Sequence, residues 1–350
     1  MAQQNKNHYT TVQDNGILKL RGILAVLPTF INDYFRGIAH TTSISTRIGY
    51  AYDLITFFNY LKSINPTLMN VPVQAQDLSE LSSIDIEKYL EYLSHYEETD
   101  GTIRTNGNDG IARKFSALTR LYTYLYKHQI INANPTDIVD APKRRKKNIV
   151  RMDAGEMAYL LDEIENYGTT LSGQALTYYE KTKCRDITIV IVFLGTGVRI
   201  SELIGLNIPD IDFRENRLKI TRKGGNEDYV YFNSEVEEYL RKYLSTVREN
   251  IVPLSSHENA LFLSIQRKRI SISAVEEMIV KYAKKIIPDK KITPHTLRRS
   301  FGTSLYQETG DIGLVSETLG HSSVQTTKDH YAAIEEGRKR KTISDFRLRE

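Results

Sequence analysis

The apolar pattern of this chain is interrupted most completely between residues 134 and 147, and that interruption limits what the chain can fold into. Asn134-Pro135 ends a helical pattern, because proline breaks a continuing helix. Residues 141–147 then read APKRRKK, a proline-led basic run without an apolar stripe. The chain has 350 residues, of which 40% are hydrophobic, enough for two cores. We therefore expect a first domain over residues 1–142, a basic linker over 143–150 and a second domain over 151–350.

The first part shows helical periodicity after a polar start. Apolar residues recur at i, i+3 and i+4 in four stretches, which is typical of amphipathic helices. The stretches are residues 27–38, 44–64, 84–96 and 110–128. A loop rich in Gly, Asn and Thr is expected over 100–110. Helices joined by short polar turns bury their apolar faces on one another, so we predict a small all-α bundle.

The second part mixes helical patterns with one hairpin signature. Asp153 and Glu156 predict a capped helix start, and the apolar run 186–194 fits a buried helix or a strand, of which we favour the helix. Residues 217–221 and 228–232 flank Gly224-Gly225-Asn226 and predict a β-hairpin. A further short strand is considered at 261–263. The remaining predicted helices are 234–247, 271–286, 294–307, 312–319 and 324–334. The expected fold class is mostly α, with a small antiparallel sheet in an α+β second domain.

Charge and cysteine content limit the partners, the metal sites and the cellular location that we expect. The 47 Lys and Arg against 43 Asp and Glu leave a net charge of +4, too small by itself to establish a polyanionic partner. Cys184 is the single cysteine, which excludes a disulfide framework and a thiolate metal cage. The polar start has no signal-peptide core, and no apolar run approaches the roughly 20 residues of a membrane span. We expect a cytoplasmic protein without a membrane partner.

Several polar residues lie where local structure does not require them. Arg199 follows an apolar run and Gly195-Thr196-Gly197, and Lys223 lies at the tip of the predicted hairpin. His295 and Arg298 are three residues apart in the first turns of a helix that Thr293 caps, near its positive end. Each has a plainer interpretation: a surface pair of Arg199 with Glu202, a turn lysine, or a solvated basic helix.

Two more candidates complete the set. His321 follows Gly320, a predicted helix C-cap, and Tyr331 comes ten positions later. Together the candidates supply a phenol, two guanidinium groups, two imidazoles and one ammonium, without an obvious set of metal carboxylates. Such a group suits attack of tyrosine on a phosphodiester, with arginines stabilising the charge of the transition state. A carboxylate-metal nuclease is a weaker alternative.

In order and approximate spacing, these motifs resemble the tyrosine recombinase (phage integrase) superfamily. The resemblance rests on GTGVRISEL around Arg199, Lys223 in the hairpin, His295-x-x-Arg298, Leu-Gly-His321 and Tyr331. It implies that Tyr331 forms a 3′-phosphotyrosyl link to DNA while Arg199, Arg298 and His321 bind the scissile phosphate. His295 would assist proton transfer and Lys223 would protonate the departing 5′-hydroxyl. No metal or nucleotide cofactor is implied.

The same resemblance assigns roles to the rest of the chain. The first part is similar to the SAM-like core-binding domain, a helical bundle that clamps duplex DNA. The basic run would then contact the phosphate backbone. Its residues are Lys143, Arg144, Arg145, Lys146 and Lys147. One departure from many relatives is Arg299, where they carry histidine, and His330 has no assigned role.

The two-domain size, and the segment 172–186, resemble the stand-alone Xer recombinases. That branch implies a homotetramer on two sites and a Holliday junction intermediate, with chromosome dimer resolution as the outcome. Integration or excision of a mobile element is the open alternative. An accessory or activating protein is also left open. The tail 335–350 either docks on a neighbouring protomer or is a frayed terminus. The competing functions are strand cleavage and resealing like that of a type IB topoisomerase, and non-catalytic DNA binding on the same scaffold.

Overall fold

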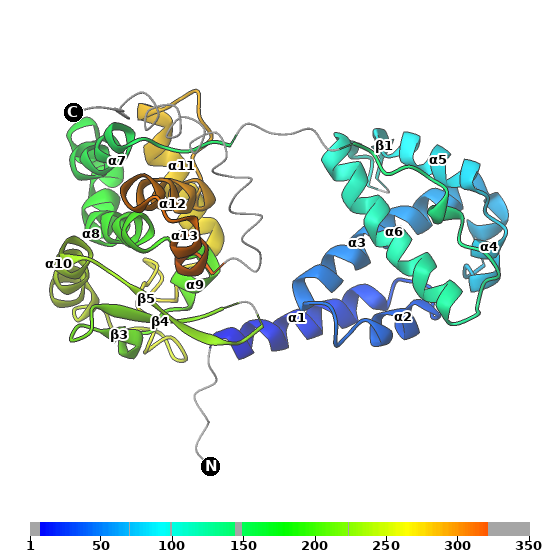
Figure 1. Ribbon diagram of the computed structural model, residues 1–350, viewed down its shortest axis with the longest axis horizontal. Coiled ribbons are helices and arrows are strands. Elements are labelled where there is room, and N and C mark those ends of the chain that lie inside the picture. The colour runs from blue at the N-terminus through cyan, green and yellow to red at the C-terminus, as the bar shows by residue number, and fades with distance from the viewer. Residues whose placement is uncertain (1–7, 70, 99, 144–148, 223, 321–350) are drawn as a thin grey trace, which may run out of the picture. The chain divides into compact units, whose positions relative to one another are not determined.

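The computed structural model describes residues 8–69, 71–98, 100–143, 149–222 and 224–320 (Figure 1). The chain divides into two compact units, Met1–Lys147 and Asn148–Glu350. This division falls within the basic segment that the sequence analysis treats as a linker. Among the described residues, no helix combines the length and the apolar character needed to cross a membrane.

Unit 1 is built mainly from helices around one core. Its helices are α1 (His8–Leu24), α2 (Ile31–Gly37), α3 (Ile44–Ile64), α4 (Ala75–Ser79), α5 (Ser83–Tyr92) and α6 (Asn108–Lys127), with short 3-10 turns at Pro66–Met69 and Pro135–Asp137. α3 packs against both α1 and α6. Aromatic side chains fill the centre of the core, among them the fully buried Tyr34, Phe57, Tyr89 and Tyr122.

Local sequence explains where the long helices begin. The Ser43 hydroxyl accepts a hydrogen bond from the Thr46 backbone N–H at 3.3 Å, which caps the start of α3. Inside the bundle the buried carboxylate of Asp53 is paired with Lys114 at 3.2 Å and with Arg113 at 2.5 Å. These two ion pairs join α3 to α6.

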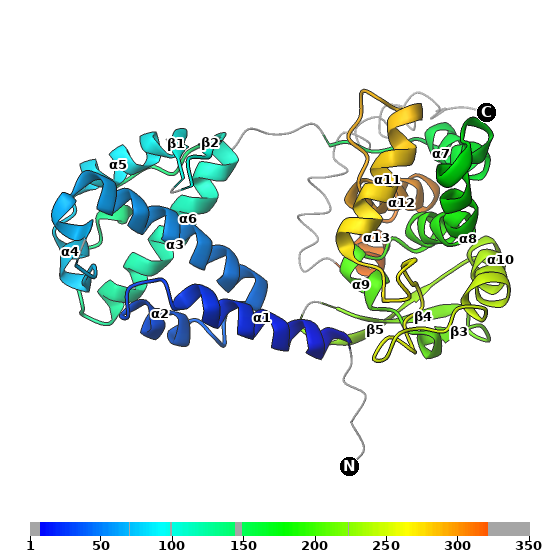
Figure 2. The same cartoon turned by 180° about the vertical axis from the view of Figure 1, so that it is seen from behind.

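The all-α expectation for unit 1 is wrong at one place. Strands β1 (His95–Glu97) and β2 (Ile103–Thr105) form an antiparallel hairpin, so the predicted helix 84–96 ends early and the predicted loop contains a strand (Figure 2). The Tyr96 ring packs 5.2 Å from that of Tyr92, and Gly101 supplies the turn with φ +82°. Helical spacing of aromatic residues therefore concealed a local hairpin.

Two helices of unit 1, α1 and the short α4, were not predicted, and one helix boundary was misplaced. The start of the chain was expected to be polar, whereas α1 begins at His8 and buries only Leu20 and Ile23. An apolar face that narrow gives a weak periodic signal. The predicted helix 27–38 begins later, at Ile31, after a turn in which the Ile31 N–H donates to the Pro28 carbonyl.

Unit 2 packs helices around one buried helix and also contains a small sheet. Its helices are α7 (Ala154–Asn166), α8 (Gly173–Thr196), α9 (Ile200–Gly205), α10 (Ser234–Tyr243), α11 (Ile272–Ile286), α12 (Pro294–Thr309) and α13 (Ile312–Thr318). Its strands are β3 (Ile211–Asp212), β4 (Arg217–Thr221) and β5 (Glu227–Tyr231). Short 3-10 turns lie at Tyr167–Thr170 and Ile208–Asp210, and a π turn at Leu244–Arg248.

The apolar run 186–194 is the centre of unit 2. It lies within α8, and its residues 187–193 are all buried because α7, α10 and α12 pack against this helix (Figure 1). The predicted buried helix is thus confirmed. Asp153 accepts from the Glu156 N–H at 2.8 Å and Glu156 accepts from the Asp153 N–H at 2.9 Å, which is the predicted start of α7.

The sheet has the order β3-β4-β5 and is antiparallel throughout. Leu218 pairs with Val230 and Thr221 with Glu227, which confirms the predicted hairpin and adds a third strand, β3. Residues 261–263 do not form the strand that was considered. Leu263 forms only an isolated antiparallel bridge with Arg269. The Leu261 carbonyl accepts from the Tyr243 hydroxyl, and the Leu263 carbonyl accepts from Arg185.

Candidate active site

Arg199 is delivered by a sharp reversal of the chain. Gly195 and Thr196, expected in a turn, still belong to α8, and Gly197 ends that helix in the left-handed region with φ +64°. A Cβ at Gly197 would lie 2.3 Å from a ring carbon of Phe301, so only glycine fits there. The chain then turns into α9, with Arg199 at its N-cap.

Glu202 collects three guanidinium groups around one buried carboxylate, whose side chain is 1% exposed. It accepts from the Arg199 backbone N–H at 2.7 Å and from Arg199 Nη1 at 2.8 Å. Arg222 Nη1 lies 3.5 Å from Glu202, and Arg298 Nη1 lies 4.0 Å away. The interpretation of Arg199 and Glu202 as a surface pair is therefore wrong, because the acid is inside the protein.

Arg199 and Arg298 also meet at the C-terminal end of α13. Arg199 Nη2 donates to the Gly320 carbonyl at 2.8 Å, and Arg298 Nη2 donates to the Leu319 carbonyl. Arg298 Nη1 donates to the Gly197 carbonyl. The last carbonyls of a helix lack intrahelical partners and carry partial negative charge, so they attract cations. The two predicted arginines are thus brought to one place.

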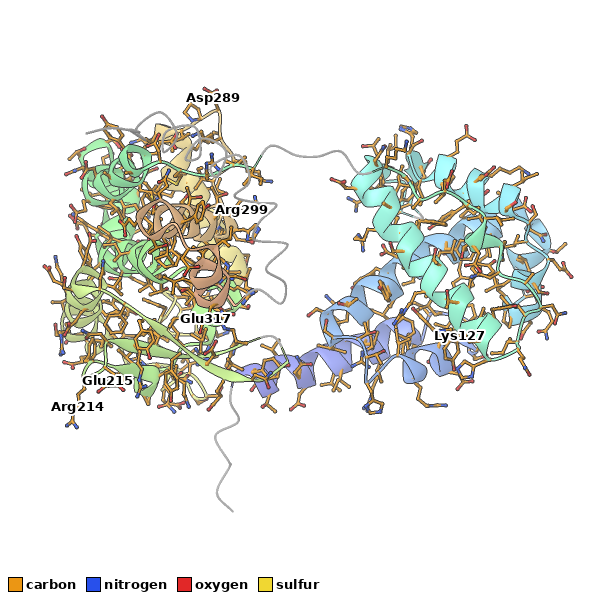
Figure 3. The ribbon with its side chains drawn as sticks, in the orientation of Figure 1. Lys127, Arg214, Glu215, Asp289, Arg299 and Glu317 are labelled. Carbon is orange, nitrogen blue, oxygen red and sulfur yellow. The ribbon has the colours of Figure 1, made fainter. Side chains whose placement is uncertain are left out.

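The predicted helix start at Thr293 is confirmed. Thr293 accepts from the Thr296 N–H at 3.3 Å, and Pro294 takes the first turn of α12. His295 is exposed, whereas Arg298, one turn later, is only 4% exposed. The interpretation of a solvated basic helix is thus wrong for Arg298. Arg299 is half-buried on the same helix (Figure 3).

The other predicted site residues lie outside the described residues. These are Lys223, His321, Tyr331, Arg144, Arg145, Lys146 and Lys147, and the predicted helix 324–334 lies there too. Lys143 is exposed, and its carbonyl accepts from Asn108 Nδ2 at 2.9 Å.

Arg222 is a residue that the sequence analysis did not single out. Its Nε donates to Asp228 at 3.0 Å, Nη1 lies 3.4 Å from the Leu319 carbonyl and Nη2 lies 3.4 Å from the Thr318 carbonyl. With its contact to Glu202 it joins the same cluster. The only sequence signal was its position beside Lys223.

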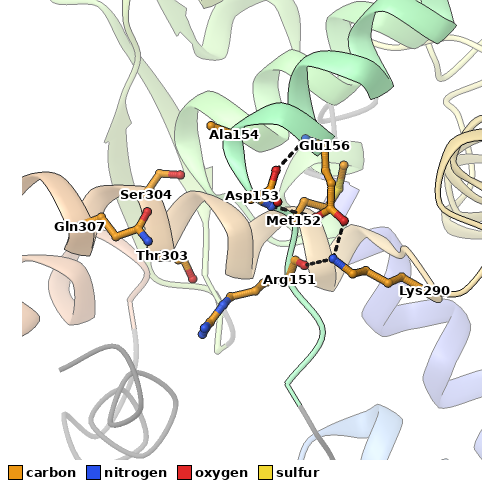
Figure 4. A pocket seen from close by; sticks show the side chains of 9 residues that line it. All are labelled: Arg151, Met152, Asp153, Ala154, Glu156, Lys290, Thr303, Ser304 and Gln307. Atoms are coloured by element: carbon orange, nitrogen blue, oxygen red, sulfur yellow. Dashed lines mark hydrogen bonds and ion pairs between the residues drawn. The ribbon is translucent and has the colours of Figure 1, made fainter. Parts of the chain in front are cut away.

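A separate pocket in unit 2 lies between the start of α7 and α12 (Figure 4). It contains the ion pair of Lys290 with Glu156. Its lining is Arg151, Met152, Asp153, Ala154, Glu156, Lys290, Thr303, Ser304 and Gln307. None of the predicted catalytic residues is among them. The described residues also contain no group of three or more His, Cys, Asp or Glu side chains arranged to hold a metal ion.

Comparison with known proteins decides the family. The model of the phage integrase family matches residues 151–338, more than half of the chain. The chain belongs to the phage integrase family. It is accordingly a tyrosine recombinase, an enzyme that cuts and rejoins DNA strands, as the motifs predicted. The topoisomerase-like and non-catalytic alternatives are not favoured.

Relatives of this phage integrase family member align over nearly its whole length. Tyrosine recombinase XerS of Streptococcus thermophilus is 30% identical over 344 residues, which cover 90% of this chain and 94% of XerS. Tyrosine recombinase XerC of Caldanaerobacter subterraneus is 30% identical over 328 residues, covering 91% and 86%. The predicted resemblance to Xer recombinases is therefore confirmed.

Solved structures share the fold of this family member. XerH site-specific recombinase bound to palindromic difH has a TM-score of 0.63 at 20% identity, covering 88% of this chain and 81% of XerH. The Tn1549 transposon integrase in complex with circular intermediate DNA has a TM-score of 0.60 at 19% identity, covering 85% and 93%. Two domains, one helical and one α+β with a small antiparallel sheet, agree with the predicted fold class.

Proposed function

We propose that this tyrosine recombinase acts at a specific duplex DNA site through Tyr331 and holds the scissile phosphate with Arg199 and Arg298. One observation carries the proposal. The two arginines come from different helices, α9 and α12, and both donate to the end of α13, directly before His321. A cluster of guanidinium groups fixed in advance by a buried carboxylate is suited to the negative charge that grows on a phosphate in the transition state.

The chemistry follows from the residue types. The Tyr331 oxygen attacks phosphorus, its proton passes to a base for which His295 is the candidate, and the bond from phosphorus to the 5′-oxygen breaks. Lys223 gives its proton to that oxygen, which leaves as a hydroxyl. Arg199, Arg298 and His321 bind the non-bridging oxygens. Religation reverses these steps with a 5′-hydroxyl from the partner strand, which yields a Holliday junction and then recombinant DNA.

The remainder of the chain is assigned as follows. Residues 1–142 form a helical core-binding domain, residues 143–150 cross the phosphate backbone, and residues 151–350 carry catalysis. A homotetramer assembles on two sites in the cytoplasm. Alignment with XerS over 94% of that protein supports a role of the Xer type, chromosome dimer resolution, over integration of a mobile element.

The test captures the covalent intermediate. The protein and its Tyr331→Phe variant are expressed in the source cell, and the cells are lysed in denaturant with EDTA. DNA linked to protein is recovered and its attached ends are sequenced. We expect adducts at one recurrent sequence with Tyr331 and none with phenylalanine, because a phenyl ring has no nucleophilic oxygen.

Each other outcome contradicts a defined part of the proposal. Adducts scattered over the genome would contradict site specificity and favour topoisomerase-like cleavage. Adducts that persist with Tyr331→Phe would remove Tyr331 as the nucleophile. Complete dependence of purified-protein cleavage on added Mg²⁺, abolished by EDTA, would favour two-metal chemistry instead.

A further inference from the structure

Arg222 connects the hairpin of β4 and β5 to the end of α13. Its backbone belongs to the hairpin, because its N–H donates to the Asn226 carbonyl at 2.7 Å and its carbonyl accepts from Gly225 at 3.1 Å. Its side chain leaves the hairpin and reaches the carbonyls of Thr318 and Leu319, each at 3.4 Å. Although this side chain carries a full charge, it is only 11% exposed.

The backbone of the hairpin tip is closed only by local hydrogen bonds among its described residues, those of Arg222 with Gly225 and Asn226. The strand ladder ends at the pair Thr221 and Glu227, and Gly224 and Gly225 follow with φ of +98° and +90°. Because glycine has no Cβ, its backbone can adopt many conformations, so these two residues do not restrict the conformation of the turn. Among the described residues of the tip, Arg222 is the one whose side chain bonds to α9 and α13.

The Arg222 guanidinium group packs closely against Gly320, where only glycine leaves room for it. Gly320 adopts φ +56°, and a Cβ there would lie 2.6 Å from the Arg222 guanidinium carbon. The guanidinium therefore rests against the backbone that leads into His321. On the other side of the guanidinium group, Arg222 Nε donates to Asp228 of β5 at 3.0 Å. These contacts give the planar guanidinium group a fixed orientation.

We propose that Arg222 is a positioning residue for leaving-group protonation: it fixes the hairpin tip to α9 and α13 and thereby sets where the neighbouring Lys223 delivers its proton. The inference rests on the proposed function, in which Lys223 protonates the 5′-oxygen. Arg222 acts through Lys223 and does not contact the phosphate. A flexible tip would place the ammonium group at a range of distances, and a misplacement of about 1 Å can slow catalysis on the order of 10²-fold.

The test changes the leaving group. Duplexes carrying the sequence recovered from the adducts are made with the natural 5′-oxygen or with sulfur at the bridging 5′ position of the scissile phosphate. A thiolate leaves without a proton because thiols are far more acidic than alcohols. We expect Arg222→Ala to cut the oxygen substrate on the order of 10²-fold more slowly than the unsubstituted enzyme, and the sulfur substrate nearly as fast. Lys223→Ala should show the same pattern.

Matched variants separate the explanations. Lys219→Ala removes a cation of β4, which pairs with Glu227 within the hairpin at 3.2 Å, and should leave both rates unchanged. Asp228→Asn weakens the hold on Nε while Arg222 and Glu202 stay in place, so it should slow only the oxygen substrate, and it keeps the test decisive if Arg222→Ala does not fold.

Equal slowing of both substrates by Arg222→Ala and Asp228→Asn would overturn the inference, because that pattern belongs to a phosphate contact or to a purely structural role. If sulfur rescues Lys223→Ala but neither of these variants, the inference alone fails. If sulfur does not rescue Lys223→Ala, the assigned role of Lys223 fails, and the inference with it.

Discussion

Replacing Glu202 with glutamine probes the centre of the arginine cluster. The substitution keeps the size of the side chain and one carbonyl oxygen but removes the negative charge. Three guanidinium groups, from Arg199, Arg222 and Arg298, then face one another without the acid that lies within 4.0 Å of each. The carboxylate is 1% exposed, so water cannot replace it.

The expected cost follows from these contacts. The ion pair with Arg199 Nη1 at 2.8 Å becomes a hydrogen bond from a charged donor to a neutral amide oxygen, a loss of about 1–2 kcal/mol. Arg298 loses the partner of a buried charge at 4.0 Å, and part of that loss is offset because a buried amide is easier to desolvate than a carboxylate. We expect Glu202→Gln to lower the free energy of unfolding of unit 2 by about 2–3 kcal/mol.

Urea denaturation followed by hydrogen exchange and mass spectrometry measures this cost within unit 2. Fragment resolution is needed because a chain of two compact units need not unfold in one transition. Glu276→Gln, at an exposed position of α11, is the control for loss of one negative charge. Added sulfate should stabilise Glu202→Gln more than the unsubstituted protein, since an anion bound to the native cluster replaces the missing charge.

An unchanged urea midpoint for fragments from α9 and α13 would refute the reasoning, because it would mean that Glu202 does not hold the arginines together. A drop equal to that of Glu276→Gln would do the same. Destabilisation without any added response to sulfate would contradict the electrostatic part and leave only lost packing.

Two further outcomes are expected. Arg199→Ala should slow strand cleavage on the order of 10²–10³-fold in single-turnover assays, with nearly unchanged DNA affinity in gel-shift titrations, because the charge acts chiefly in the transition state; an unchanged cleavage rate would make Arg199 merely structural. Gly197→Ala should lower the free energy of unfolding by at least about 2 kcal/mol in urea denaturation, because φ +64° strains alanine and its Cβ would collide with Phe301; the matched Gly22→Ala, in α1 with open space around its Cβ, should not destabilise the protein.

Local patterns of residues predicted much of the secondary structure. The cap at Asp153, the hairpin around residues 224–226 and the buried helix through residues 187–193 were all predicted correctly. The cap and the hairpin depend on hydrogen bonds among residues close in the chain, and a continuous apolar run marks a helix that other elements will bury. The order and spacing of the motifs from Arg199 to Tyr331 likewise predicted the family, which the comparison shows.

Only the tertiary structure decided which charges are inside and which groups meet. Glu202 looked like the partner of a surface pair and proved to be a buried carboxylate shared by arginines of α9, α12 and the hairpin. Arg222 carried no signal of its own, because its partners on α13 lie 96 and 97 residues further along the chain. Periodicity and motifs report neighbours in the chain, whereas burial and charge contacts arise when distant helices pack. The sequence therefore specifies the chemical groups of the site, and packing sets their geometry.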